Sequence, residues 1–187
     1  MPSRAPLLLA VSAHLCYNRL MNTSLPVIGQ NELVSIGTRA IDVPAKIDTG
    51  ADSSSIWASD IKVRRDGTLI FKLFGEGSDY YSGKVFKRTD YKVAMVRSAM
   101  GEEQIRYRTR MTIKVAGRKI RVLFNLSDRS RNNFKILIGR RTVSGKFLVD
   151  VSKKAIAFPK HPQTAMLNKK LTKNPYKFHK KYVKVSK

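Results

Sequence analysis

The residues best suited to chemistry lie in one short segment, PAKIDTGADSSSIWA, and are Asp48, Thr49, Gly50, Ala51 and Asp52. Alternating apolar residues just before Asp48 predict a strand that is buried on one face. Gly50 allows a sharp turn after that strand, because a residue without a Cβ atom reaches backbone conformations that other residues avoid. A carboxylate on a loop at the end of a rigid strand can activate a water molecule. Asp48 is therefore the candidate catalytic residue.

This pattern needs a second motif to support it, because an aspartate in a turn after a strand is common without any catalytic role. Residues 134–141 read FKILIGRR, an apolar run that leads into Gly139 and Arg140. D-T-G-A-D followed by small hydroxyl residues, together with this downstream segment, resembles the retropepsin-like aspartic proteases. The chain is more closely similar to a bacterial family of this type, long labelled ATP-dependent zinc protease. The similar segments lie between residues 27 and 158 and read VIGQNELVSI, VPAKIDTGADSSS, NLSDRSRNNFKILIGRR and FLVDVSK.

The resemblance implies a catalytic site shared between two copies of the chain. Aspartic proteolysis uses two carboxylates that share one proton across a water molecule, and the sequence contains one D-T-G motif. The second Asp48 would therefore come from the other subunit of a twofold-symmetric homodimer. One Asp48 would activate water while the other protonates the departing amine. Thr49 would hydrogen-bond across the pair, and Gly50 would contact the substrate backbone, with Ala51 completing the active-site loop.

The same resemblance assigns a supporting role to Asp52, Gly139 and Arg140. Asp52 and Arg140 are expected to form an ion pair within one subunit, which would tie the catalytic loop to the segment around Gly139. We expect this pair to be desolvated, so that removing one partner would cost about 3–5 kcal/mol. Its role would be structural support for the site rather than catalysis.

A hairpin between the two motifs is the candidate for the flap that closes over substrate in retropepsins. Lys92–Arg97 and Gln104–Arg110 have the pattern of two strands, and the residues SAMGEE join them. The tip of the flap would consist of Ser98, Ala99, Met100 and Gly101. A plain surface hairpin is the alternative interpretation.

Short strands and almost no helical periodicity predict an all-β, retropepsin-like closed barrel over residues 27–158. The strands expected before the flap are Val27–Ile36, Ile41–Ile47, Ile56–Ile61 and a hairpin of Thr68–Phe74 with Tyr80–Phe86. Those expected after it are a hairpin of Met111–Val115 with Ile120–Asn125, a buried strand at Lys135–Ile138, and closing strands at Lys146–Val149 and Ala155–Phe158. A short helix is expected at Arg140–Ser144. Trp57 is expected in the core or in the wall of a pocket.

The chain is strongly basic. Its formal net charge is +24, and residues 151–187 contain eleven lysines and no arginine, aspartate or glutamate. Such a field attracts polyanions, so nucleic acid, an anionic membrane surface and an acidic peptide are all candidate partners.

Residues 159–187 are expected to be a flexible basic extension, because they combine prolines with a high density of lysine. Aromatic residues are interleaved with lysine in a pattern suited to phosphate contacts and base stacking. The candidate nucleic-acid tail comprises Lys169, Lys170, Tyr176, Phe178, Lys180, Lys181 and Tyr182. A solvated tail without a fixed partner is the alternative.

Residues 1–26 are expected to form a disordered or weakly helical leader. The apolar run after Arg4 has some features of an export signal, but it is short and lacks a clear cleavage site. It is also too short to cross a membrane as a helix. We therefore expect a cytoplasmic protein without integral membrane association, with an export signal as the alternative and Met21 as an alternative start.

No metal or other cofactor is expected. The single Cys16 allows neither an intrachain disulfide nor a cysteine metal cluster, and His14, His161 and His179 lie outside the region of resemblance. Neither an HExxH zinc motif nor a GxxxxGK[ST] phosphate-binding loop occurs in the chain. The zinc and ATP of the old family label therefore find no support in these residues.

Together these observations predict an aspartic endopeptidase. Bacterial members of the similar family often accompany ligases that add glutamates to a ribosomal protein, so an acidic oligoglutamate tail is one candidate substrate. Ordinary peptides are the other. A protein with a charge of +24 would attract an oligoglutamate chain. The alternative function is that of a basic RNA- or ribosome-binding protein on a degenerate protease fold.

Overall fold

The computed structural model describes residues 25–38, 40–97, 101, 103–157 and 162–182. The expected leader, apart from its last two residues, and the flap-tip residues Ser98, Ala99 and Met100 lie outside these ranges. Residues 1–156 and residues 157–187 form two separate units, which are described in turn.

The first unit is built almost entirely from strands. Those before the flap hairpin are β1 (Val27–Ile28), β2 (Asn31–Ile36), β3 (Ala40–Asp48), β4 (Ser54–Val63), β5 (Leu69–Leu73) and β6 (Val85–Arg88). Those from the flap hairpin onward are β7 (Tyr91–Arg97), β8 (Glu103–Val115), β9 (Arg118–Ser127), β10 (Ile136–Gly139) and β11 (Leu148–Val149), with the short helix α2 (Arg140–Val143) after β10.

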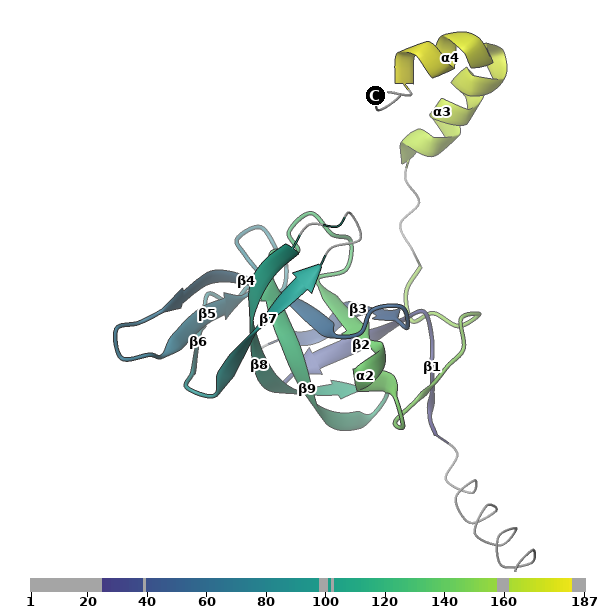
Figure 1. The fold of residues 1–187 in the computed structure, drawn as a ribbon. Coiled ribbons are helices and arrows are strands. Elements are labelled where there is room, and N and C mark those ends of the chain that lie inside the picture. The colour runs from purple at the N-terminus through teal and green to yellow at the C-terminus, as the bar shows by residue number, and fades with distance from the viewer. Residues whose placement is uncertain (1–24, 39, 98–100, 102, 158–161, 183–187) are drawn as a thin grey trace, which may run out of the picture. The chain divides into compact units, whose positions relative to one another are not determined.

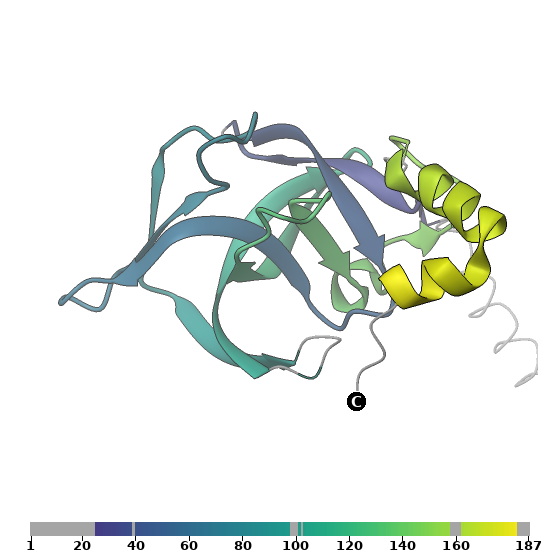
Figure 2. The same ribbon diagram turned by 90° about the horizontal axis from the view of Figure 1, so that it is seen from above.

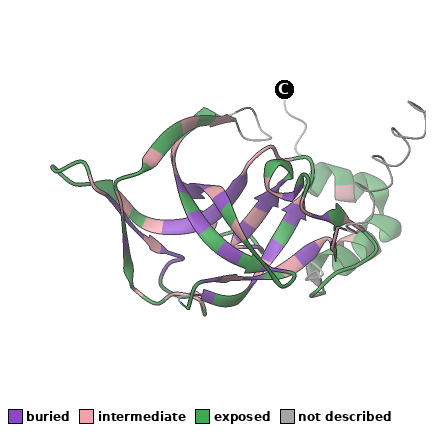
Figure 3. Ribbon diagram, turned by 90° about the horizontal axis from the view of Figure 1, so that it is seen from below, coloured by how far each residue is buried: buried purple, intermediate pink, exposed green. Residues whose placement is uncertain are grey.

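Six of these strands close into a barrel, in the order β10, β3, β2, β8, β9, β4 and back to β10. The ring is mixed, because β10 runs parallel to β3 and β9 runs parallel to β4, whereas the other pairs are antiparallel. Buried side chains such as Val34, Val43, Phe124 and Ile136 fill its interior. Figure 3 shows buried positions concentrated on the strands of the first unit. The predicted all-β closed barrel is confirmed.

An antiparallel extension of β4, β5 and β6 projects from the ring (Figures 1 and 2). Its core is aromatic. Phe71 stacks on Phe86 with ring centroids 5.3 Å apart, and Trp57 meets Phe74 edge-on at 6.4 Å. Trp57 is 9% exposed, so it is a core residue, as expected.

The predicted hairpins are present with two differences. The strands expected at Gln104–Arg110 and Met111–Val115 form one continuous strand, β8, which pairs with β7 along its first half and with β9 along its second half. The strand expected from Tyr80 begins only at Val85, because turns occupy the residues before it and the ring of Tyr80 packs against Phe74 at 5.7 Å.

The expected strands at the two ends of the domain are also shorter than predicted. Val27–Ile36 is split into β1 and β2, and β1 pairs with β11 in a separate two-stranded sheet. The strand predicted at Ala155–Phe158 is absent from its described residues. The buried Asn31 side chain replaces it, since its amide accepts a hydrogen bond from the Ile156 N–H at 2.9 Å and donates one to the Ile156 carbonyl at 3.0 Å.

The second unit, expected as a flexible basic extension, has regular secondary structure over its described residues. It contains two helices, α3 (Pro162–Lys173) and α4 (Pro175–Tyr182). Each begins with proline, which is favoured at the first helical position because its fixed φ angle suits the helix and its missing N–H is not needed there. Asn174 caps α4 by accepting a hydrogen bond from the Lys177 N–H at 2.9 Å. Lysine, leucine, alanine and methionine are good helix formers and supply much of α3.

Candidate active site

Asp48 is the last residue of β3, and the backbone of the loop after it holds one of its carboxylate oxygens. Asp48 Oδ1 accepts hydrogen bonds from the N–H groups of Gly50, at 3.2 Å, and Ala51, at 3.1 Å. The other oxygen, Oδ2, lies 3.8 Å from Lys46 Nζ, and the side chain is 28% exposed. One oxygen is thus fixed by the loop while the side chain as a whole stays partly exposed to solvent, which suits a positioned acid–base group.

The segment from Gly139 to Arg141 lies directly against the catalytic loop. Gly139 stands opposite Asp48 in the parallel pairing of β10 with β3. The N–H of Arg140 donates to the Ala51 carbonyl at 2.8 Å, and the N–H of Gly139 donates to Ser54 Oγ at 3.0 Å. Glycine is required at 139, because a Cβ atom there would lie 2.6 Å from the carbonyl carbon of Ser53. The structure therefore brings the two sequence motifs together, as the resemblance implied.

The predicted ion pair between Asp52 and Arg140 is present, but it is not desolvated. Arg140 Nη2 lies 2.9 Å from Asp52 Oδ1, and Arg141 Nη2 lies 2.6 Å from Asp52 Oδ2. The Asp52 side chain is 45% exposed, so the expected penalty of several kcal/mol for breaking the pair was too high. Exposed ion pairs contribute about 0–1 kcal/mol. Arg141 was not predicted as a second partner of Asp52, although it directly follows Arg140 in the sequence.

Replacing Asp52 with asparagine is therefore expected to lower the free energy of unfolding of the single chain by about 1 kcal/mol or less. The loss should appear in urea unfolding followed by circular dichroism. Asp60→Asn is a matched control, because Asp60 forms an ion pair with Lys72 at 2.7 Å in the β4–β5 extension. If Asp52 supports the catalytic loop, its variant will lose more peptidase activity than the control. A destabilisation of 3 kcal/mol or more would contradict the assignment of an exposed pair.

A cavity of about 880 Å³ adjoins the catalytic loop. Gly50, Ala51, Asp52 and Ser53 line it, and so does Ala94–Arg97 of the candidate flap. The hairpin and the catalytic loop thus line the same cavity. Of the four predicted tip residues, the structure describes Gly101, which is exposed and has a φ of +85°, as is typical of a turn glycine. The flap role remains a prediction.

Arginine dominates the charge of this cavity. Arg97, Arg106, Arg108, Arg129 and Arg141 line it, against two acidic residues, Asp52 and Asp128. Arg129 donates to the Phe134 carbonyl and to Ser55 Oγ, both at 3.1 Å. Burial lowers the pKa of the Arg129 guanidinium and Arg106 acts in the same direction, whereas the negative charge of Asp48 raises it. Sequence reasoning did not identify this set, because its members are scattered along the chain.

The exposed Thr49 side chain forms no hydrogen bond with another described residue, so its predicted bond across the catalytic pair remains a prediction. Within the residues that the structure describes, no three histidine, cysteine or acidic side chains group together as metal ligands would. No helix of the described ranges is both long and apolar enough to cross a membrane.

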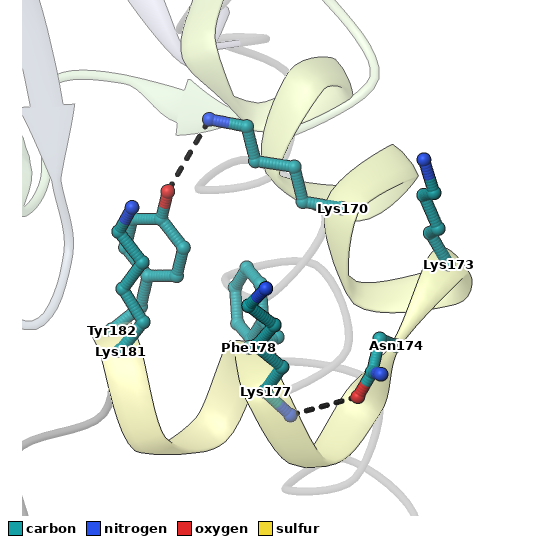
Figure 4. Close-up of a pocket in the computed structure, with 7 residues that line it drawn as sticks. All are labelled: Lys170, Lys173, Asn174, Lys177, Phe178, Lys181 and Tyr182. Carbon is teal, nitrogen blue, oxygen red and sulfur yellow. Dashed lines mark hydrogen bonds between the residues drawn. The ribbon is translucent and has the colours of Figure 1, made fainter.

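The helical unit carries a second candidate site, which includes four residues of the predicted nucleic-acid tail, namely Lys170, Phe178, Lys181 and Tyr182 (Figure 4). A cavity of about 390 Å³ lies among Lys170, Lys173, Asn174, Lys177, Phe178, Lys181 and Tyr182. The rings of Phe178 and Tyr182 lie 4.9 Å apart, and Lys170 Nζ donates to the Tyr182 hydroxyl at 3.3 Å. This bond holds the pKa of the Tyr182 phenol below its usual value. Lys180 lies over the ring of Tyr176 at 4.9 Å, whereas Lys169 is simply exposed.

A family model described as the retropepsin-like aspartic endopeptidase RimB matches residues 27–160, and thus spans the barrel, the catalytic loop and the Gly139 segment. The chain belongs to the RimB-like family. It is also 30% identical over 133 residues to two curated proteins, each named "Probable alpha-L-glutamate ligase", from Shewanella pealeana and Shewanella halifaxensis. The match covers 67% of this chain and 28% of each relative, so the chain spans about a quarter to a third of their length.

A crystal structure of a protein of unknown function from Legionella pneumophila has the same fold. It superposes with a TM-score of 0.52 and 22% sequence identity, over 69% of this chain and 95% of that one. The RimB-like family assignment confirms the resemblance predicted from the two motifs, and this structure supports the barrel fold.

Proposed function

We propose that this RimB-like chain is an aspartic endopeptidase that is active as a homodimer and prefers acidic peptides. The observation that carries the proposal is the Asp48 carboxylate, which has one oxygen held by the loop N–H groups on a side chain that is 28% exposed. It lies beside a Gly139–Arg140 segment in the arrangement implied by the family. The sequence supplies one such aspartate, so a second must come from a partner subunit.

Hydrolysis would use the two carboxylates in opposite roles. Asp48 of one subunit takes a proton from a water molecule, whose oxygen forms a bond to the carbonyl carbon of the peptide. The partner subunit's Asp48, which holds the shared proton, gives it to the nitrogen as the carbon–nitrogen bond breaks. The products are a carboxylic acid and an amine, and the proton taken from water restores the shared proton.

Two independent observations support acidic peptides as the preferred substrates. The cavity beside the catalytic loop contains more arginines than acidic residues. The Shewanella relatives are named as ligases of glutamate, and a ligase and a peptidase act on the same kind of bond in opposite directions. Complementary charge raises the rate of encounter and favours the matching partner.

The proposal is tested by incubating the purified full-length protein with a peptide library that includes oligoglutamate, across pH 4–8. We expect cleavage within acidic peptides, detected by mass spectrometry of the products. Faster cleavage of neutral peptides would overturn the substrate preference but not the reaction. Absence of cleavage by a verified dimer would instead favour the binding function considered next.

Single-stranded RNA binding by α3 and α4 is a second candidate function, which can coexist with the first. Residues 162–182 contain no acidic residue, and their lysines lie beside aromatic rings. Lysine neutralises phosphates while aromatic rings stack on bases. These are the chemical requirements of a site for single-stranded nucleic acid.

The test of this function is the salt dependence of binding to a single-stranded RNA oligonucleotide. Lys173→Gln, Lys177→Gln and Lys181→Gln, combined in the full chain, should reduce the slope of log K against log salt by about 2, because each phosphate contact contributes roughly 0.7. A control carries the same charge loss on exposed barrel lysines, namely Lys62→Gln, Lys114→Gln and Lys119→Gln. Equal reductions in both proteins would indicate nonspecific attraction and contradict a site on the helices.

A further inference from the structure

Three residues that line the cavity beside the catalytic loop each carry a buried polar atom without a hydrogen-bond partner among the described residues. Among the described residues, the buried side-chain nitrogen and oxygen atoms left without a partner are Arg108 Nε, Asn125 Oδ1 and Ser127 Oγ. All three residues line this one cavity. Burying a polar group without a partner usually costs about 1–3 kcal/mol. Their convergence therefore indicates a surface that is completed by a polar ligand.

The charges of the same cavity define the chemistry of that ligand. Arg97 is paired with Glu103, and Arg141 is paired with Asp52. The remaining three arginines, Arg106, Arg108 and Arg129, form no ion pair with any described residue. Arginine stays charged in proteins, and its planar fork of donors fits the two oxygens of a carboxylate. An anion with two planar oxygens matches the geometry and the sign of charge of these guanidinium groups.

These arginines come from two parts of the barrel unit that meet at the cavity. Arg106 and Arg108 are on the half of β8 that pairs with β7, opposite Ala94 and Lys92, and so belong to the candidate flap hairpin. Arg129 follows β9, and its guanidinium is held in place by the Phe134 carbonyl and Ser55. Arg108 also stands opposite Asn125 in the pairing of β8 with β9. A carboxylate bound here would contact both the hairpin and the barrel.

We propose that Arg106, Arg108 and Arg129 form a specificity subsite that binds a carboxylate of the peptide substrate next to the bond being cleaved. Arg108 Nε donates to this carboxylate, while Ser127 and Asn125 complete the polar surface around it. The inference rests on the proposed peptidase function and deepens it, because it assigns the acidic preference to particular residues. The carboxylate belongs either to an acidic side chain or to the carboxyl terminus of the peptide.

Binding is tested separately from cleavage, in the Asp48→Asn background, with fluorescently labelled peptides. Three peptides are compared: an oligoglutamate peptide, the same peptide with glutamine in place of each glutamate, and the oligoglutamate peptide with an amidated carboxyl terminus. Anisotropy should show at least about tenfold tighter binding of the glutamate peptide than of the glutamine peptide, because hydrogen bonds between charged groups are lost. A loss confined to the amidated peptide would assign the subsite to the terminal carboxylate. Equal binding of all three would overturn the proposal.

Arg108→Gln should remove most of the preference for glutamate over glutamine, with little change in binding of the glutamine peptide. Arg110→Gln is the matched control, because Arg110 lies two residues further along β8 and lines a different cavity. It removes the same charge and should leave the preference unchanged. Arg106→Gln provides a second test in case Arg108→Gln fails to fold, since the hydrogen bond that the Arg106 side chain donates among the described residues goes to the neighbouring Gln104 side chain at 2.9 Å. Equal effects of Arg108→Gln and Arg110→Gln would indicate general electrostatic attraction and contradict the subsite.

Kinetic measurements with Asp48 intact then distinguish an effect on substrate binding from an effect on the reaction. The Arg108→Gln effect should appear as a higher KM for the glutamate peptide with a smaller change in kcat. Cleavage without glutamate selectivity would contradict the subsite and leave the peptidase proposal intact. Selective binding without any cleavage would contradict the peptidase proposal and leave the subsite intact.

Discussion

Replacing Asp48 with asparagine is expected to lower kcat/KM for peptide hydrolysis by about 10²–10⁴-fold, the range that a positioned acid–base group contributes. The fold should survive, because the asparagine carbonyl oxygen can still accept the hydrogen bonds that Asp48 Oδ1 receives from Gly50 and Ala51. Circular dichroism and thermal unfolding of the variant check this. Asp42→Asn is a control on an exposed aspartate elsewhere on β3. Equal activity of the Asp48 variant and wild type would place the reaction at another site or in a contaminant.

Mixing the two proteins tests whether the site is shared between subunits. When wild-type and Asp48→Asn subunits are exchanged at equal amounts, roughly a quarter of random dimers contain two intact aspartates. Specific activity per total protein should therefore fall to about a quarter of the wild-type value. A fall to one half would mean that each subunit works alone. Unequal ratios extend the test, because activity should follow the square of the wild-type fraction for a shared site.

Gly139→Ala is expected to lower kcat/KM by about 10²-fold, because displacing a catalytic group by about 1 Å can have an effect of this size. A Cβ atom at this position would lie 2.6 Å from the Ser53 carbonyl carbon and 2.8 Å from the Ala51 carbonyl oxygen. These are backbone atoms of the catalytic loop, so the loop must shift rather than a flexible side chain. Overpacking of this kind also destabilises a fold by about 1–3 kcal/mol.

Gly75→Ala is the control that distinguishes destabilisation of the fold from displacement of the catalytic loop. A Cβ atom at Gly75 would lie 2.7 Å from the Trp57 ring in the β4–β5 extension, where neither residue lines the cavity beside the catalytic loop. Both variants should unfold at lower urea concentration than wild type. Under conditions where both are folded, only Gly139→Ala should be impaired in catalysis. Full activity of Gly139→Ala would show that Asp48 does not depend on this packing.

The sequence by itself determined the barrel, the catalytic loop and the element that supports it. Alternation of apolar residues identified β3, the β7–β8 hairpin and the β8–β9 hairpin, because the two-residue period of a strand is visible in any strand with one buried face. The two motifs around Asp48 and Gly139 predicted that these two segments lie against each other, and the structure adds that β10 pairs with β3 there. Glycine is needed at 139 because the backbone there packs directly against the backbone of the catalytic loop. The motif therefore indicated a contact between segments that are distant in sequence.

Other features were decided by the tertiary structure, because they depend on residues distant in sequence. The Asn31 amide takes the place of a closing strand through hydrogen bonds to Ile156, and no local pattern reports a bond across 125 residues. The solvent exposure of Asp52 depends on what surrounds it in the folded chain, and this overturned the expected desolvation. The helices α3 and α4 escaped prediction because lysines obscure an apolar helical period.

The proposed arginine subsite is the clearest example of a feature that the tertiary structure decided. Arg106, Arg108 and Arg129 look like ordinary surface charges in a chain with a net charge of +24. Only the pairing of β8 with β9 and the turn after β9 bring them around one cavity beside the catalytic loop. The residue pattern predicted Asp48 as the candidate catalytic residue, whereas only the folded barrel placed the three arginines around one cavity.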